Sequence, residues 1–82
     1  MEVFTYLVKS LKDESYYTGI SENPDKRVGE HNQGKLKITA LKRPWKLVYK
    51  KLHFSYLEAR KHEKWLKKKS HQYKCKLESD EL

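Results

Sequence analysis

The residue types that can hydrolyse a phosphodiester bond occur at separate places along this 82-residue chain. Such hydrolysis requires a group that activates water, positive charge at the phosphate and, in many enzymes, a divalent cation. Tyr or His can act as the base, Arg can contact the phosphate, and Glu can bind Mg²⁺. The candidates for these roles are Tyr6, Tyr17, Arg27, His31 and Glu63. Together they indicate metal-dependent phosphodiester chemistry.

Considered alone, each candidate also has a structural explanation. Paired tyrosines on a hairpin usually pack against each other, and an Arg or His on a helix is usually solvated or bonded to a helix end. Glu63 is harder to explain, because helical spacing places it in an apolar stripe with Tyr56, Ala59 and Leu66. A carboxylate there is costly unless it is paired, hydrated or bound to metal. Glu63 is therefore either the partner of a nearby Lys or Arg or a metal ligand.

Two strands are expected to position the tyrosines. Residues 3–8 form an apolar run, typical of a buried strand, and residues 15–20 resemble a second strand. A hairpin turn near Leu11 and Lys12 would place Tyr6 opposite Tyr17, to within a residue or two.

A helix is expected to position Arg27 and His31. Asn23 and Pro24 provide a helix start and Gly34 a stop. Because Arg27 and His31 are four residues apart, they share one face of this helix. Residues 35–44 are basic and weakly periodic, which indicates a loop or a short helical piece.

Glu63 is expected on a second helix. Residues 45–54 alternate as a third strand does, and Ser55 with Glu58 forms a capping box that opens a helix to about residue 69. The order strand, strand, helix, strand, helix predicts an α/β domain with a small, mainly antiparallel three-stranded sheet flanked by helices. We expect one domain over residues 1–82, with a core at about 3–69 and a tail at 70–82 that is basic, then acidic.

The net charge of +8 is concentrated in one part of the chain. Residues 31–77 hold 15 Lys or Arg and two Asp or Glu, whereas residues 1–30 hold four and six. Such a basic region can neutralise phosphates and release their counterions, so we expect a nucleic-acid partner. The candidate contacts are Lys35, Lys37, Lys42, Arg43, Arg60, Lys64, Lys67, Lys68 and Lys69.

Several other classes of protein are disfavoured. Cys75 is the only cysteine, so no intramolecular disulfide can form, and a structural zinc site would need the scattered histidines. No stretch has the roughly 20 apolar residues of a membrane span. The first residues lack the basic start and apolar core of a signal peptide. We therefore expect a cytoplasmic protein without membrane contact.

The spaced motifs resemble the GIY-YIG nuclease domain, and in particular its small stand-alone bacterial members. The resemblance covers about residues 3–69. It is carried by Phe4-Thr5-Tyr6, Tyr17-Thr18-Gly19, Asp25-Lys26-Arg27, His31-Asn32-x-Gly34, Arg43-Pro44-Trp45-Lys46-Leu47-Val48-Tyr49 and Glu58-Ala59-Arg60-x-x-Glu63-Lys64. Two elements depart from the family letters, because Phe-Thr-Tyr replaces Gly-Ile-Tyr and Tyr-Thr-Gly replaces Tyr-Ile-Gly.

The resemblance implies a Mg²⁺-dependent or Mn²⁺-dependent endonuclease that acts on DNA with one metal ion. It implies that Tyr17 activates water with help from Tyr6 and His31, and that Arg27 contacts the scissile phosphate. By the same resemblance Glu63 holds the metal.

The same resemblance implies that Gly19 allows a close backbone approach. Many family members carry an additional DNA-binding domain that supplies specificity, so a protein partner could serve this chain instead. Two alternatives stay open: a non-catalytic DNA- or RNA-binding module, and a protein scaffold whose charge serves only solubility.

Overall fold

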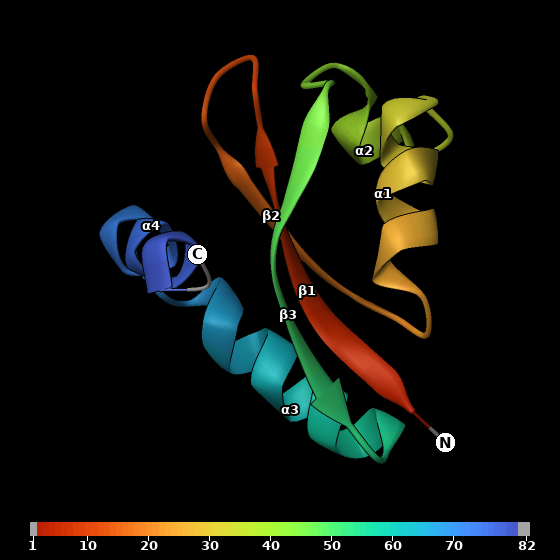
Figure 1. The fold of residues 1–82 in the computed structure, drawn as a ribbon, viewed down its shortest axis with the longest axis vertical. Helices are drawn as coiled ribbons and strands as arrows, with labels where there is room; N and C mark the ends of the chain where they lie inside the picture. The colour runs from red at the N-terminus through yellow and green to blue at the C-terminus, as the bar shows by residue number, and fades with distance from the viewer. Residues whose placement is uncertain (1, 81–82) are drawn as a thin grey trace.

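The computed structural model describes residues 2–80, which form a three-stranded sheet with helices on both faces (Figure 1). The strands are β1 (Val3–Ser10), β2 (Tyr16–Ser21) and β3 (Trp45–His53). The helices are α1 (Pro24–Asn32), α2 (Lys37–Ala40), α3 (Tyr56–Lys67) and α4 (His71–Asp80). The strand order is β2-β1-β3 and both pairings are antiparallel. The predicted fold class is confirmed.

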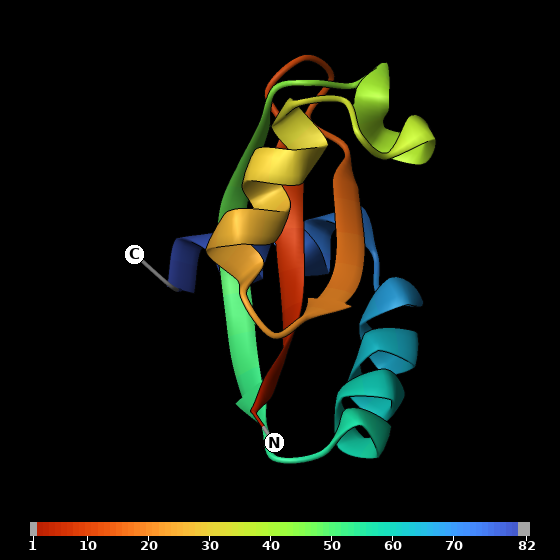
Figure 2. The same ribbon diagram turned by 90° about the vertical axis from the view of Figure 1, so that its right-hand side faces the viewer.

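The central strand β1 divides the core into two parts. Tyr6 and Val8 pack with Trp45 on the side of the sheet that α1 covers. Leu7 packs with Leu66 on the opposite side, where α3 and α4 lie. Figure 2 shows α1 in front of the sheet and α4 behind it. Because β1 has covered faces on both sides, it is apolar at consecutive positions rather than alternating ones.

The predicted helix boundaries match the structure where local chemistry sets them. The side chain of Asn23 accepts a hydrogen bond from the backbone N–H of Lys26, and Ser55 accepts one from Glu58 in the same way. Gly34 follows the end of α1 with a φ of 77°, a conformation that glycine adopts without strain. The basic segment at 35–44 contains the short helix α2.

The hairpin register lies two residues from the predicted pairing, at the limit of the predicted range. Tyr6 pairs with Gly19 rather than with Tyr17. The turn is longer than expected because Glu14 adopts a left-handed conformation with a φ of 64° and its N–H bonds to the carbonyl of Ser10. The shift leaves Tyr17 on the same face as Tyr6, one diagonal step along the sheet.

Two further expectations need correction. Tyr56 was expected in one apolar stripe with Ala59 and Leu66; those two are buried, but Tyr56 is 54% exposed because it occupies the first position of α3, at the edge of the molecule (Figure 1). The segment after residue 69 has no strong periodicity, yet it forms α4, whose Tyr73 and Leu77 pack against the core. The acidic end at 78–82 lies only partly within the described residues. No helix within residues 2–80 is long and apolar enough to cross a membrane.

Candidate active site

Tyr6 brings a buried hydroxyl to the α1 side of the sheet. Its side chain is 1% exposed, and its ring lies across the backbone of the paired strand at Gly19. A Cβ atom on Gly19 would lie 2.5 Å from the Tyr6 hydroxyl oxygen. The phenol therefore occupies space that only glycine leaves open.

His31 lies in the last turn of α1 and forms a hydrogen bond with the hydroxyl of Tyr6. The Tyr6 Oη atom lies 2.9 Å from His31 Nε2, and His31 Nδ1 lies 2.8 Å from Thr39 Oγ1. The Thr39 hydroxyl in turn donates to the carbonyl of Leu36 at 3.3 Å. Because Thr39 gives its one proton to Leu36, its oxygen accepts from Nδ1–H. His31 therefore presents an unprotonated Nε2 to Tyr6.

Helix α2 is fixed in place by the residues around it. The indole N–H of Trp45 donates to the carbonyl of Thr39 at 2.9 Å, and the side chain of Asn32 bonds to both the N–H and the carbonyl of Trp45. Thr39 is 1% exposed. Sequence reasoning missed this residue because no periodicity marks it within a basic, loop-like segment. Asn32 and Trp45 belong to the quoted motifs, but the sequence did not show that they anchor α2.

Burial and charge set the protonation states of the site. Burial lowers the pKa of His31, and the neighbouring Arg27 charge lowers it further, so the ring is neutral at pH 7. Burial raises the pKa of Tyr6 to about 12, while the Arg27 guanidinium acts in the opposite direction. Tyr17 and Glu63 both add to the rise. The pKa of Tyr6 therefore depends on Arg27, Tyr17 and Glu63 as well as on burial.

Arg27 borders a cavity at the start of α1. Its Nη1 atom lies 2.8 Å from Glu30 Oε1, which holds the guanidinium along the helix. The cavity has a volume of about 330 Å³ and is lined by residues 20–23 after β2 and by Lys26, Arg27 and Glu30. The guanidinium of Arg27 therefore forms part of the wall of this cavity.

Glu63 lies on α3, and its charge adds to the rise in the pKa of Tyr6. Its side chain is 12% exposed, 3.9 Å from Arg60 Nε and 3.4 Å from Lys67 Nζ. Both cations are more than half exposed, so these pairs on one helix are weak and easily exchanged. Within residues 2–80 no three His, Cys, Asp or Glu side chains gather as a metal cage. The donor set fits Mg²⁺, which commonly binds through one or two carboxylates, water and substrate phosphate.

Tyr17 lies beside His31 without joining its hydrogen-bond chain. The Tyr17 ring lies edge-on to His31 with a centroid separation of 5.2 Å, and 6.5 Å from Trp45. Within residues 2–80 no hydrogen bond joins its hydroxyl to another side chain.

The basic candidates form two groups, one in and around α2 and one on and just after α3. They are Lys35, Lys37, Lys42 and Arg43, and Arg60, Lys64, Lys67, Lys68 and Lys69. Four of them have other contacts. Arg60 and Lys67 pair with Glu63, Lys42 pairs with Asp13 at 3.4 Å, and the Lys69 ammonium lies 4.7 Å from the Trp65 ring.

The two threonines that depart from the family letters, Thr5 and Thr18, have structural explanations. Thr5 faces the α3 side, where its hydroxyl donates to the carbonyl of Ala59 at 3.0 Å and also contacts His53. Thr18 is 3% exposed, and its hydroxyl is the one buried side-chain polar atom within residues 2–80 without a hydrogen-bond partner. It fills an apolar position. Neither change touches Tyr6 or His31.

The fold and site define a small α/β domain in which Tyr6 on β1 lies with Arg27 and His31 on α1, and in which the charge of Glu63 on α3 contributes to the Tyr6 pKa. The model of the GIY-YIG catalytic domain matches residues 2–76. This chain belongs to the GIY-YIG family.

The relatives of this chain include small bacterial proteins of similar length. It is 41% identical over 78 residues to UPF0213 protein SSP2268 of Staphylococcus saprophyticus, covering 94% of each chain. It is 41% identical over 75 residues to UPF0213 protein SH2523 of Staphylococcus haemolyticus, covering 90% of each. The solution NMR structure of UPF0213 protein BH0048 from Bacillus halodurans matches with a TM-score of 0.58 and 34% identity, over 96% of this chain and 84% of that one.

Proposed function

We propose that this protein is a Mg²⁺-dependent endonuclease that hydrolyses phosphodiester bonds in DNA. The observation that carries the proposal is the buried hydrogen-bond chain from Tyr6 through His31 to Thr39, beside Arg27. A neutral histidine with a free acceptor nitrogen is a suitable general base near pH 7. Membership of the GIY-YIG catalytic domain family supports a nucleic-acid substrate.

The proton of the attacking water moves along this chain. The Tyr6 oxygen takes a proton from the water as its own proton passes to His31 Nε2, so His31 becomes the imidazolium. Direct ionisation of Tyr6 is unfavourable because its pKa is about 12, and the concerted transfer avoids a free phenolate. Tyr17, whose ring contacts His31, orients the water and the ring. The His31–Tyr6 pair thereby takes the role that sequence analysis assigned chiefly to Tyr17.

Arg27 stabilises the phosphate during the displacement. The water oxygen forms a bond to phosphorus as the bond to the 3′ oxygen breaks, which yields a 5′-phosphate and, after protonation from solvent, a 3′-hydroxyl. The guanidinium can donate two hydrogen bonds to the equatorial oxygens. Glu63 would hold one Mg²⁺ or Mn²⁺, which when bound supplies Lewis-acid stabilisation of the leaving oxygen.

The proposal also covers the basic residues, the extent of the domain, its location in the cell and its partner. The basic residues around α2 and on α3 contact the phosphate backbone, and residues 1–82 act as one domain in the cytoplasm. A protein partner would supply sequence or structure specificity. A non-catalytic nucleic-acid-binding module is the second candidate, favoured by the ion pairs that Glu63 makes without metal.

Glu63→Gln separates the two candidates. For an endonuclease, this variant keeps its stability within about 1 kcal/mol, because both cationic partners of Glu63 are more than half exposed and their ion pairs are weak. It binds DNA in chelator at least as tightly as the wild type, since one negative charge is gone, and it loses nearly all Mg²⁺-dependent nicking of supercoiled plasmid. Glu58→Gln, on the same helix but exposed, is the matched control and nicks normally.

A different pair of results would favour the second candidate. A wild-type protein that binds DNA without nicking it in Mg²⁺ or Mn²⁺, together with a Glu63→Gln variant that binds identically, would establish the non-catalytic module instead.

A further inference from the structure

The outer surface of α2 exposes an unusual pair of apolar side chains. Ile38 is 74% exposed and Leu41, directly after the helix, is 83% exposed. These are the largest exposed fractions of any large apolar side chain within residues 2–80. The two residues are three positions apart and share one side of the turn. Neither belongs to the hydrophobic clusters of the described core.

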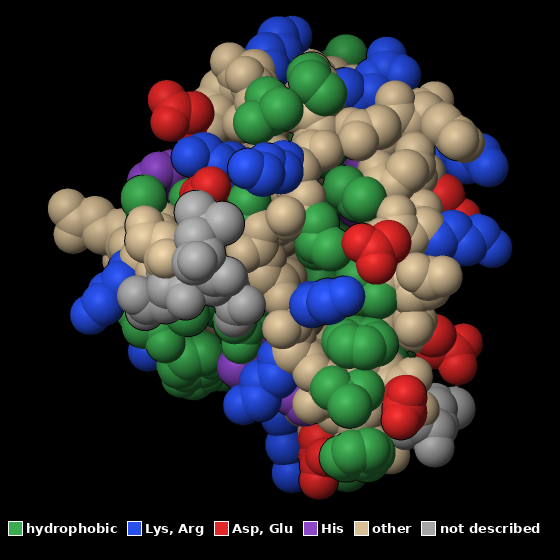
Figure 3. Space-filling model, in the orientation of Figure 1, with side chains coloured by type: hydrophobic (Ala, Val, Ile, Leu, Met, Phe, Trp, Pro, Cys, Tyr) green, Lys and Arg blue, Asp and Glu red, His purple; other side chains and the backbone are tan. Residues whose placement is uncertain are grey.

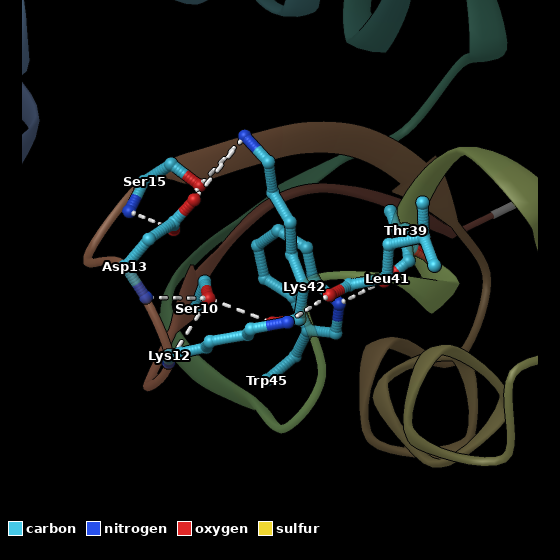
Figure 4. A network of polar contacts seen from close by, with 8 residues as sticks. All are labelled: Ser10, Lys12, Asp13, Ser15, Thr39, Leu41, Lys42 and Trp45. Atoms are coloured by element: carbon cyan, nitrogen blue, oxygen red, sulfur yellow. Dashed lines mark hydrogen bonds and ion pairs between the residues drawn. The ribbon is translucent and has the colours of Figure 1, made fainter.

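The pair is held on a fixed support. Thr39, between the two residues, is buried against His31, and the carbonyl of Thr39 accepts from Trp45. On the other side, the Lys12 ammonium donates to the carbonyl of Leu41 at 3.1 Å (Figure 4). The segment after α2 is therefore joined to the β1–β2 turn. Figure 2 shows α2 standing out from the body of the molecule.

The surroundings of the pair are basic. Lys35, Lys37 and Arg43 are exposed on or near α2, and Lys42 lies between Leu41 and Arg43 in the chain. At this end of the molecule, apolar side chains stand among Lys and Arg side chains on the surface (Figure 3). A protruding apolar tip within a ring of cations complements nucleic acid, whose apolar base faces lie between two rows of phosphates.

We propose that Ile38 and Leu41 form an apolar wedge that inserts at an interrupted base step of DNA, such as a nick or a bulge. This inference rests on the proposed function for its nucleic-acid partner. Unstacking an intact step costs a few kcal/mol, and the cost is least where stacking is already broken. The wedge therefore gives the protein a preference for discontinuous duplexes over continuous ones.

The shape of the pair favours DNA over a membrane surface. Helices that bind in the membrane interface present a long apolar face, whereas α2 has four residues and offers two side chains. The same turn carries Thr39, which bonds to His31. A substrate that contacts the wedge therefore lies against the turn that holds His31.

The test compares two pairs of exposed apolar residues. The double variant Ile38→Ala/Leu41→Ala removes the wedge. The control Phe54→Ala/Leu57→Ala removes side chains that are 70% and 64% exposed, where β3 leads into α3. Binding is measured in chelator, so that cleavage plays no part, on matched duplexes with and without a central nick flanked by 2-aminopurine.

We expect the wild type and the control to bind the nicked duplex about tenfold more tightly than the intact one and to raise 2-aminopurine fluorescence at the nick. The wedge variant should lose both effects while binding the intact duplex within about twofold of wild type. Retained discrimination in the wedge variant, equal loss in both variants, or no preference in the wild type would overturn the proposal. So would wedge-dependent binding to vesicles of anionic and neutral phospholipid without any effect on DNA.

The outcome is separable from that of the proposed function. Discrimination between the duplexes is read without metal, whereas nuclease activity is read as plasmid nicking in Mg²⁺. A protein that prefers nicks through the wedge but never cleaves would refute the nuclease and retain the wedge. A protein that nicks plasmid but shows no preference for nicked duplexes would refute the wedge and retain the nuclease.

Discussion

The two faces of the sheet each bury a histidine against a hydroxyl, but they fix opposite tautomers. On the α1 face, His31 gives its Nδ1–H to Thr39 and accepts from Tyr6 at Nε2. On the α3 face, Thr5 donates to the carbonyl of Ala59, so its oxygen accepts from His53 Nε2–H at 3.1 Å. His31 therefore presents an unprotonated nitrogen, whereas His53 presents an N–H donor.

The difference shows that burial alone does not identify a base. His53 is 8% exposed and His31 is fully buried, so burial separates them little. What separates them is the surroundings. His31 lies beside Tyr6 and the Arg27 charge, and Arg27 borders a cavity. His53 ties the end of β3 to the start of α3 through Thr5 and Ala59. We therefore expect substitutions at the two histidines to affect different properties.

We expect the largest effect on the nicking rate when each of the two histidines is replaced by glutamine in a separate variant. His31→Gln removes the terminal base and should lower the single-turnover rate of plasmid nicking by about 10³-fold, within the range for general-base catalysis. His53→Gln should leave that rate within about threefold. It should instead lower the free energy of unfolding by about 1–3 kcal/mol, the scale for disturbing a buried hydrogen bond. Urea titrations and nicking assays on the same preparations measure both.

Equal rate losses at the two positions would contradict this division. A His31→Gln variant with full activity would remove the histidine from the mechanism.

Local chemistry made most of the fold predictable from the sequence. The start of α1 at Asn23 and its stop at Gly34 depend on neighbouring residues alone, and the continuous apolar run of β1 reports a strand covered on both faces. The hairpin register was predictable only to within two residues, because a single left-handed residue, Glu14, lengthens the turn. No residue type demands that conformation, so the sequence carried no signal for it.

The site was predictable only in part, for a related reason. Motif spacing brought Tyr6, Arg27, His31 and Glu63 together as candidates. Thr39 was missed because its role depends on a bond to a residue eight positions away through a turn of helix that has no periodic signature. Its importance comes from tertiary position and not from its residue type.

A smaller effect is expected from the two threonines that hold the histidines. Thr39→Val keeps the shape but removes the acceptor for His31 Nδ1–H, so the ring can reverse its tautomer and protonate Nε2. The turnover rate should fall about tenfold, and the ¹⁵N resonances of His31 should change from the Nδ1–H pattern to the Nε2–H pattern. Thr39→Ser, which retains the hydroxyl, should restore both.

Thr5→Val is the matched control on the other face. It removes a buried acceptor from His53, so its loss of stability should resemble that of Thr39→Val, about 1–3 kcal/mol. Its turnover rate and the His31 resonances should remain unchanged. If both valine variants slow turnover equally, Thr39 has only a structural role.

The smallest effect concerns stability against pH. His31 in the folded protein has a pKa below its ordinary 6.5, because burial and Arg27 disfavour the imidazolium. As the pH falls through 6.5, the unfolded chain binds a proton at this residue before the folded protein does, so stability decreases toward lower pH.

Between pH 7.5 and pH 5.5, above the ordinary carboxylate range, we expect His31 to contribute a loss of about 1 kcal/mol, since one pH unit is worth at most about 1.4 kcal/mol per site. His62, whose pKa burial also lowers, adds a loss of the same sign. Urea titrations at both pH values should show a smaller pH-dependent loss in His31→Gln than in the wild type, and a similar reduction in His62→Gln. If His31→Gln keeps the full loss, the ring is not held neutral, and the contrast between the two faces would then rest on geometry alone.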